Sequence, residues 1–295
     1  MPVLKPYRGD YYLWNYIPSI AASVIFTLLF IGATSAHFWR QFKTRSKFCW
    51  PFSLGCLFEV IGYAGRATAA NKTEKLMPYV IQSFFLLVAP ALFAASIYMT
   101  LGRIIRCVKG EHHSIIRINW LTKVFVTSDV LSFMVQGGSS GLMFNESTAH
   151  IGEMVVLVGL FIQIIAFGLF FICAVIFKRR MDARPTLESY IATAPWKQTL
   201  YMLYTVSILI FVRSIFRVVE YIQGQQGYSM KHEWTLYIFD SIPMFVVAVV
   251  FFIYYPSTLQ RASAEDIPIN EYTGSNNVQD GKASYQSQVQ RYMSA

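Results

Sequence analysis

Long apolar runs alternate with short polar segments along most of this chain. Each run has about 20 residues, the length at which an α-helix crosses the hydrocarbon core of a bilayer. The apolar residues are continuous within a run, whereas a strand of a membrane β-barrel alternates apolar and polar positions. The pattern predicts an all-α integral membrane protein with seven transmembrane helices, at Tyr16–Phe38, Trp50–Ala70, Tyr79–Gly102, Asn119–Gly141, Ile151–Phe177, Lys197–Tyr221 and Thr235–Tyr255.

The polar segments at the two ends complete the expected organisation. Residues 1–15 are expected to form a short extracellular N-terminus, and residues 16–255 the seven-helix domain. Residues 256–295 are rich in Ser, Gln, Asn and Asp and show no apolar periodicity. A segment of this composition cannot bury enough apolar surface to fold, so we expect a disordered cytoplasmic tail.

Composition supports the membrane assignment. Of the 295 residues, 55% are hydrophobic and 14% are charged, whereas a soluble domain carries about 25% charged residues. The formal net charge of +9 is therefore better explained by loop topology than by nucleic-acid binding. We expect membrane lipids as partners and no nucleic acid; the sequence indicates no particular protein partner.

Basic residues are concentrated in alternate loops. The first, third and fifth loops carry them, at Arg40, Lys43, Arg45, Lys47, Arg103, Arg106, Lys109, Arg117, Lys178, Arg179, Arg180, Arg184 and Lys197. The positive-inside rule makes these loops cytoplasmic, which puts the N-terminus outside and the C-terminus inside. Two glycosylation sequons, at Asn71 and Asn145, fall on loops that this scheme places outside.

Three charged residues interrupt the apolar run at 207–224. Arg213, Arg217 and Glu220 are spaced so that they share one face of a helix. A charge inside a bilayer costs a few kcal/mol, so each needs a partner or water. Arg217 and Glu220, three residues apart, are interpreted as a structural ion pair. Arg213 has no acidic residue nearby in its helix and is a stronger candidate for binding.

Other spans also contain polar residues. With Arg213, the candidates for substrate binding or translocation are Glu59, Arg66, Gln82, Asp129, Gln136, Gln163 and Asp240. On the expected topology they form a polar chamber near the midplane and in the outer leaflet. Candidate hinges are Pro90, Gly137, Gly138 and Pro243. The alternative is that buried ion pairs simply fix helix register without a ligand.

Several long blocks in register are similar to one known family. They include E-V-I-G-Y-A-G-R at 59–66, A-P-A-L-F-A-A-S-I-Y-M at 89–99, D-V-L-S-F-M-V-Q-G-G at 129–138 and R-S-I-F-R-V-V-E-Y-I-Q-G at 213–224. Across roughly residues 11–256 the chain resembles the RTA-like family of fungal lipid-translocating exporters. The resemblance implies a seven-helix protein of the plasma membrane or a secretory-pathway membrane. It also implies a link to sphingoid-base translocation, resistance to toxic lipids or porphyrin handling.

Two function classes follow from these observations. The first is a transporter or flippase that exports amphipathic lipids or lipophilic toxins and confers stress resistance. The chain contains no G-x-x-x-x-G-K-[ST] pattern, so we expect no ATP hydrolysis of its own. The alternative is a seven-helix sensor or receptor of lipid stress. An enzyme is not expected, and we expect no metal and no cofactor, because the histidines fall in loops or at helix ends.

Overall fold

The computed structural model describes Trp14, Tyr16 and the ranges 18–70, 75–140, 149–186, 188–189, 195–223 and 227–256. The expected extracellular N-terminus lies largely outside these residues, and the expected cytoplasmic tail lies beyond Pro256. The two candidate glycosylation sites, Asn71 and Asn145, are also outside the described residues.

The described part of the chain is helical and contains no strand. Its long α-helices are α1 (Ile20–Thr44), α2 (Trp50–Ala69), α3 (Leu76–Cys107), α4 (Ile118–Ser140), α5 (Ala149–Ala183) and α7 (Trp196–Ile222). A short helix, α8 (Tyr228–Lys231), precedes a composite helix of α9 (Glu233–Leu236), the π-helical segment η4 (Tyr237–Ser241) and α10 (Ile242–Ile253). Two 3₁₀ turns, η1 (Lys47–Cys49) and η2 (Glu111–His113), follow α1 and α3.

The expected all-α class is confirmed, and each expected span overlaps one long helix. Five helices are long and apolar enough to cross a membrane: α1, α3, α5 from Met154, α7 and the composite helix from Glu233 to Ile253. The other two, α2 and α4, carry buried polar residues that lower their apolar character, among them Glu59 and Asp129. The number of spans and their orientation stay predictions.

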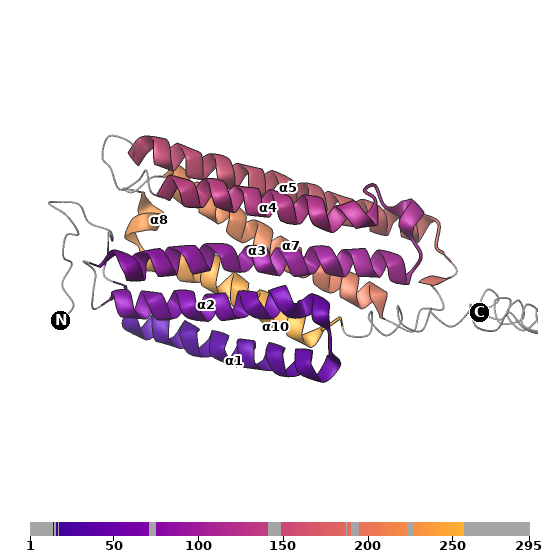
Figure 1. The fold of residues 1–295 in the computed structure, drawn as a ribbon, viewed down its shortest axis with the longest axis horizontal. Helices are drawn as coiled ribbons and strands as arrows, with labels where there is room; N and C mark the ends of the chain where they lie inside the picture. The colour runs from indigo at the N-terminus through magenta and orange to yellow at the C-terminus, as the bar shows by residue number, and fades with distance from the viewer. Residues whose placement is uncertain are drawn as a thin grey trace, which may run out of the picture.

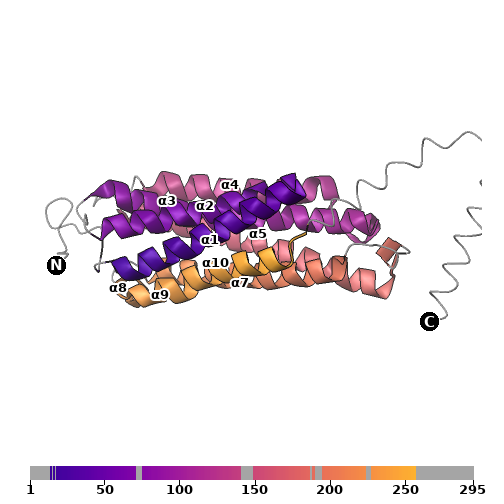
Figure 2. The same cartoon turned by 90° about the horizontal axis from the view of Figure 1, so that it is seen from below.

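The long helices lie side by side along the long axis of the molecule (Figure 1). Each of α1 to α5 packs against the next, α5 packs against α7, and α10 lies between α7 and α1, which closes the bundle. In the view turned by 90°, α10 and α7 are drawn in the lower part of the picture and α2 and α3 in the upper part (Figure 2). We call the end with α8, α9 and the start of α1 the N-terminal end. The end with η2 and the last turn of α5 is the opposite end.

Glycines on α2 allow α2 and α3 to approach closely. A Cβ atom added to Gly55 would lie 2.7 Å from the ring of Phe93, and one added to Gly62 would lie 2.8 Å from the side chain of Leu86. Small residues at such positions let helix backbones approach each other inside a membrane. These glycines therefore fix the distance between the helices that carry Glu59 and Pro90.

A branched side chain at this contact is expected to destabilise the bundle. Gly62→Val should lower the free energy of unfolding by about 1–3 kcal/mol, because the new methyl groups would push α3 away. The measurement is thermal unfolding of the purified protein in detergent, followed by size-exclusion chromatography. Gly137→Val is the matched control, since no atom lies within 4 Å of a Cβ at that position. Equal melting temperatures for the two variants would contradict the prediction.

Candidate functional site

Four charged residues form an ion cluster between α7 and η4. The carboxylate of Asp240, on η4, forms ion pairs with Arg213 and Arg217, which lie one turn apart on α7. The Arg217 Nη2–Asp240 Oδ2 distance is 2.7 Å, and Arg217 Nη1 lies 2.9 Å from Glu220 Oε2. We call Arg213, Arg217, Glu220 and Asp240 the central ion cluster. Its two positive and two negative charges balance within the protein.

The backbone around Asp240 departs from a regular α-helix. The N–H of Ile242 donates to the carbonyl of Tyr237, five residues earlier, which is the π-helical pattern. Pro243 follows directly, and because proline has no N–H, the carbonyl of Phe239 lacks its usual α-helical donor. Single π-turns of this kind are rare in proteins, and those that do occur are often found at functional sites. The π-turn thus coincides with the residue that binds both arginines.

Arg213 also contacts the backbone of α3. Its Nη2 donates to the carbonyl oxygen of Leu86 at 2.7 Å. Residue 90 is proline, so the N–H that would bond to this carbonyl in a regular helix is missing. Arg213 supplies the missing donor from α7. The proline on α3 and the ion cluster on α7 and η4 are therefore physically connected.

Glu59, on α2, lies beside the central ion cluster but is not part of it. Its side chain is 1% exposed, and its Oε1 has no hydrogen-bond partner among the residues that the structure describes. It is close enough to interact with the charges of Asp240, Arg213 and Arg217. It makes no ion pair in the described part of the chain. Since the cluster is balanced without it, the carboxyl group of Glu59 is surplus.

Asp129 is a second buried carboxyl group without a cation. It lies on α4, is 3% exposed, and accepts a hydrogen bond from the Tyr98 hydroxyl of α3 at 3.0 Å. Its other oxygen has no hydrogen-bond partner within the described ranges. Gln136, two turns further along α4, is buried against α5, where a Cβ on Gly159 would lie 2.8 Å from Gln136 Cγ. We call Asp129 and Tyr98 the α4 cluster.

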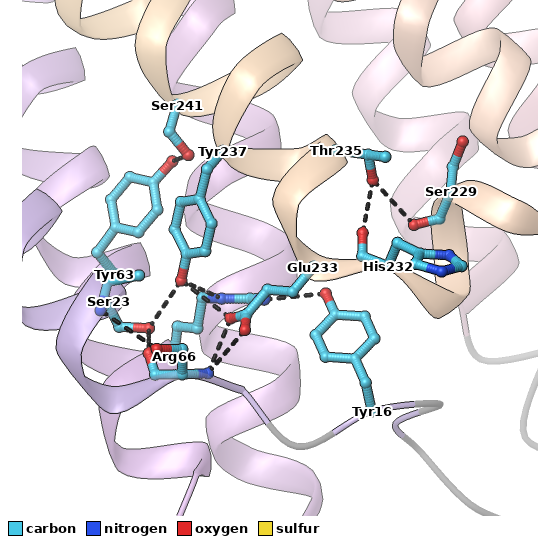
Figure 3. Close-up of polar contacts among 12 residues, drawn as sticks. Tyr16, Ser23, Tyr63, Arg66, Ser229, His232, Glu233, Thr235, Tyr237 and Ser241 are labelled. Atoms are coloured by element: carbon cyan, nitrogen blue, oxygen red, sulfur yellow. Dashed lines mark hydrogen bonds and ion pairs between the residues drawn. The ribbon is translucent and has the colours of Figure 1, made fainter.

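Arg66 belongs to a third cluster, at the N-terminal end of the bundle (Figure 3). Its side chain is 0% exposed and forms an ion pair with Glu233 of α9 at 2.8 Å. Its guanidinium also donates to the hydroxyls of Tyr16 and Tyr237, at 2.9 and 3.1 Å. The rings of Tyr16, Tyr237 and Trp14 lie 5.4–5.6 Å from Arg66 Cζ, within cation–π distance.

Glu233 ties this third cluster to the beginning of α1. Its carboxylate oxygens accept the backbone N–H of Ser19 at 2.9 Å, and its Oε1 also accepts the Tyr237 hydroxyl at 3.0 Å. Ser19 is the N-cap residue of α1. We call Arg66, Glu233, Tyr16, Tyr237 and Trp14 the Arg66 cluster. It joins α1, α2 and the composite helix.

The remaining glutamines lie apart from these clusters, whereas Pro90 and Pro243 adjoin the central ion cluster, through the Leu86 carbonyl and the π-turn respectively. Gln82, on α3, is buried and its Oε1 has no hydrogen-bond partner in the described residues, while Gln163, on α5, is half-buried. Pro90 lies within the unbroken α3, and Pro243 lies at the start of α10. The other hinge candidates, Gly137 and Gly138, are on an exposed face of α4 with no atom within 4 Å of a Cβ.

Three packed clusters thus contain most of the charged candidates, while Glu59 lies beside the central ion cluster and the glutamines lie outside the clusters. Two pockets that the structure shows lie near the opposite end, one bounded by Lys178 and Tyr201 and one by His112 and Arg184. Neither is lined by a candidate residue. Sequence reasoning missed the partners of the clusters, namely Glu233, Tyr16, Tyr237, Trp14 and Tyr98. The sequence offered two signals for these partners. One was the carboxylate of Glu233 just before an apolar run, and the other was the aromatic residues near the ends of such runs, because aromatic rings anchor at membrane interfaces.

Comparison with known proteins gives consistent results. A family model described as "RTA1 like protein" matches residues 52–263. Protein RTA1 of Saccharomyces cerevisiae is 37% identical over 84% of this chain and 86% of its own length. Protoporphyrin uptake protein 1 of the same organism is 34% identical over 82% and 91%. The sphingoid long-chain base transporter RSB1 of a Saccharomyces cerevisiae strain is 23% identical over 86% and 75%. No solved structure matches.

Proposed function

We propose, from the premise that this chain belongs to the RTA1-like protein family, that it moves amphipathic lipids or lipophilic toxic compounds across its membrane. One relative is named a sphingoid long-chain base transporter, and five helices of the described chain are long and apolar enough to cross a membrane. Transport would confer resistance to these compounds without ATP hydrolysis by the chain itself. Its substrates are membrane amphiphiles such as a sphingoid base or a sterol-like molecule.

The proposed topology has seven spans in the plasma membrane, with the N-terminus outside and the tail from residue 256 in the cytoplasm. The basic loops at the opposite end of the bundle support this orientation through the positive-inside rule. On this topology the Arg66 cluster lies toward the outer leaflet. The central ion cluster and the α4 cluster lie deeper.

The surplus carboxyl groups of Glu59 and Asp129 are the observation that carries the proposal. A buried carboxylate without a cation is costly in a medium of low polarity. It is stabilised if it takes up a proton or meets a cationic amine, and an amphiphile with an amino headgroup supplies such an amine. Arg213 and Asp240, in contrast, already satisfy each other. We therefore assign Glu59 and Asp129 the binding of the substrate amine or of a coupled proton.

The remaining candidates have supporting roles in this proposal. Gln82, Gln136 and Gln163 offer amide groups to a polar headgroup, and Arg66 with Arg213 would set the position of the helices around it. Pro90, at the contact between α3 and Arg213, and Pro243, beside the π-turn, are the proposed points of bending.

Neutral replacements of the two carboxyl groups test the proposal. Glu59→Gln and Asp129→Asn should each slow the flipping of a fluorescent sphingoid base about tenfold or more, because each removes a charge-assisted interaction worth roughly 1.5–3 kcal/mol. The assay uses the purified full-length protein in liposomes. Growth of cells on a toxic amphiphile gives a second readout. Asp182→Asn is the matched control, since this carboxylate is exposed and pairs with Lys178.

Wild-type flipping rates in both variants would rule out these carboxyl groups as the transport site. If wild-type protein flips the lipid no faster than protein-free liposomes, transport of this substrate is excluded. A sensor of lipid stress would then be the better interpretation. Surface expression and melting temperature of each variant distinguish loss of transport from loss of folding.

A further inference from the structure

A pocket of about 450 Å³ lies at the opposite end of the bundle, far from the candidate carboxyl groups. It is lined by two residues of η2 and three from the end of α5 and just beyond: His112, His113, Arg180, Ala183 and Arg184. Its volume falls within the range of about 300–1,000 Å³ that is usual for ligand pockets. The proposed transport function makes no use of it.

Backbone contacts hold the walls of this pocket together. The Nε2 of His113 donates to the carbonyl oxygen of Arg184 at 2.9 Å, and Arg180 Nη1 donates to the carbonyl oxygen of His113 at 3.3 Å. A third bond runs from the Thr186 hydroxyl to the carbonyl oxygen of Val108 at 2.7 Å. The segment with η2 is thus fixed to the end of α5, and the pocket is part of the folded structure.

The two arginines of the pocket are not neutralised by the protein. Arg180 and Arg184 are exposed, and neither forms an ion pair with any described residue. Arg184 directly follows α5, and its backbone N–H still bonds to the carbonyl oxygen of Arg180 at 3.0 Å, so the two residues lie one turn apart on the same side. Guanidinium groups present planar pairs of N–H donors that match the oxygens of a phosphate. The exposed His112 adds a further ring nitrogen.

Nearby acidic residues leave this positive charge largely uncompensated. Asp182 is paired with Lys178 at 2.7 Å, and Glu188 is paired with Lys109 at 3.4 Å. Glu111, at the start of η2, is exposed and makes no ion pair in the described ranges. An anion with two or more oxygen atoms therefore meets free donors in the pocket.

Two exposed apolar side chains follow this segment in the chain. Ile115 follows η2 and is 49% exposed, and Trp120, in the first turn of α4, is 61% exposed. An exposed tryptophan next to basic residues is typical of the zone of lipid headgroups. A pocket at this level is better placed for the headgroup of a lipid than for a solute.

We propose that the pocket formed by η2 and the end of α5 binds the phosphate group of an anionic phospholipid. Arg180 and Arg184 bind the phosphate oxygens, and His112 donates a further hydrogen bond. The acyl chains extend along the apolar surface next to Trp120. The bound lipid is a structural or regulatory partner and is distinct from the transported substrate.

Binding of a short-chain phospholipid to the full-length protein tests this site. The protein in an uncharged detergent is titrated with dioctanoyl phosphatidic acid, and affinity is measured by microscale thermophoresis. Arg180→Gln and Arg184→Gln should each weaken binding about tenfold or more, since each removes a charge-assisted contact. Arg179→Gln is the matched control: it removes the same charge from an exposed neighbour that does not line the pocket. It should change the affinity by less than about twofold.

Two comparisons complete the experiment. Dioctanoylglycerol, which lacks the phosphate, should bind much more weakly than dioctanoyl phosphatidic acid; equal binding would overturn the role of the phosphate. Inorganic phosphate that binds as tightly as the lipid would identify a soluble phosphate as the ligand and overturn the lipid. An equal loss in Arg179→Gln and Arg180→Gln would show attraction to general charge and overturn the pocket. Unchanged melting temperatures verify that the three arginine variants are folded.

Discussion

Replacing Asp240 by alanine is expected to lower the free energy of unfolding by about 3–5 kcal/mol, the largest effect of any single substitution considered for this protein. Asp240 is the common partner of Arg213 and Arg217, and it is buried. Without it, Arg213 has no carboxylate and Arg217 has only Glu220. The measurement is the loss of folded protein on heating in detergent, together with the amount that reaches the membrane in cells.

Two variants separate this effect from the mere loss of a carboxyl group. Asp240→Asn should be less harmful than Asp240→Ala, because its amide oxygen can still accept one hydrogen bond from a guanidinium. Glu59→Gln should hardly change stability, since Glu59 makes no ion pair among the described residues. A melting temperature of Asp240→Ala equal to that of Glu59→Gln would show that the central ion cluster does not hold the bundle together.

Replacing Arg213 by methionine should cost about 3 kcal/mol or more in the wild-type chain but less in a Pro90→Ala background. In the wild type, the substitution leaves Asp240 short of one cation and the Leu86 carbonyl without a donor. With alanine at position 90, the backbone N–H of this residue can bond to the Leu86 carbonyl as in any helix. The expected difference is about 1–2 kcal/mol, the cost of one unsatisfied buried carbonyl.

The double-mutant cycle measures this coupling directly. It compares wild type, Arg213→Met, Pro90→Ala and the double variant in thermal unfolding. Strictly additive effects would mean that Arg213 does not stand in for the missing N–H of Pro90. A Pro78→Ala background serves as the control, because that proline lies in the first turn of the same helix and its replacement gives the Leu86 carbonyl no new N–H donor.

Periodicity was sufficient to predict the helices and their polar faces. It identified Arg213, Arg217 and Glu220 as neighbours on one face, and the expected contact between Arg217 and Glu220 is present at 2.9 Å. What it could not supply was the partner on another helix. Spacing fixes the direction of a side chain around its own helix, whereas the neighbouring helix and its depth depend on tertiary packing.

The π-turn shows why this limit matters. A regular helix through 233–253 would fix the angle between Glu233 and Asp240, but the wider turn at η4 changes it. No sequence pattern announces a π-turn, so the simultaneous contacts of Glu233 with Arg66 and of Asp240 with Arg213 could not be foreseen. The charged residues that the sequence places inside the spans are three cations, Arg66, Arg213 and Arg217, and four carboxylates, Glu59, Asp129, Glu220 and Asp240. The structure adds Glu233 as the partner of Arg66, and thereby leaves Glu59 and Asp129 without one.

The bond between Ser19 and Glu233 has a consequence for synthesis of the protein. These residues are 214 positions apart, so α1 receives its N-terminal contact from a segment that is translated long after it. At about 5–20 residues per second, the interval is roughly 10–40 s. Arg66 precedes Glu233 by 167 positions, so for roughly 8–33 s of this interval its carboxylate partner does not yet exist. The nascent bundle must tolerate an uncompensated guanidinium until the composite helix has been synthesised and has packed against α2. A chain truncated before residue 233 should therefore be recognised by the cell's quality control as unfinished.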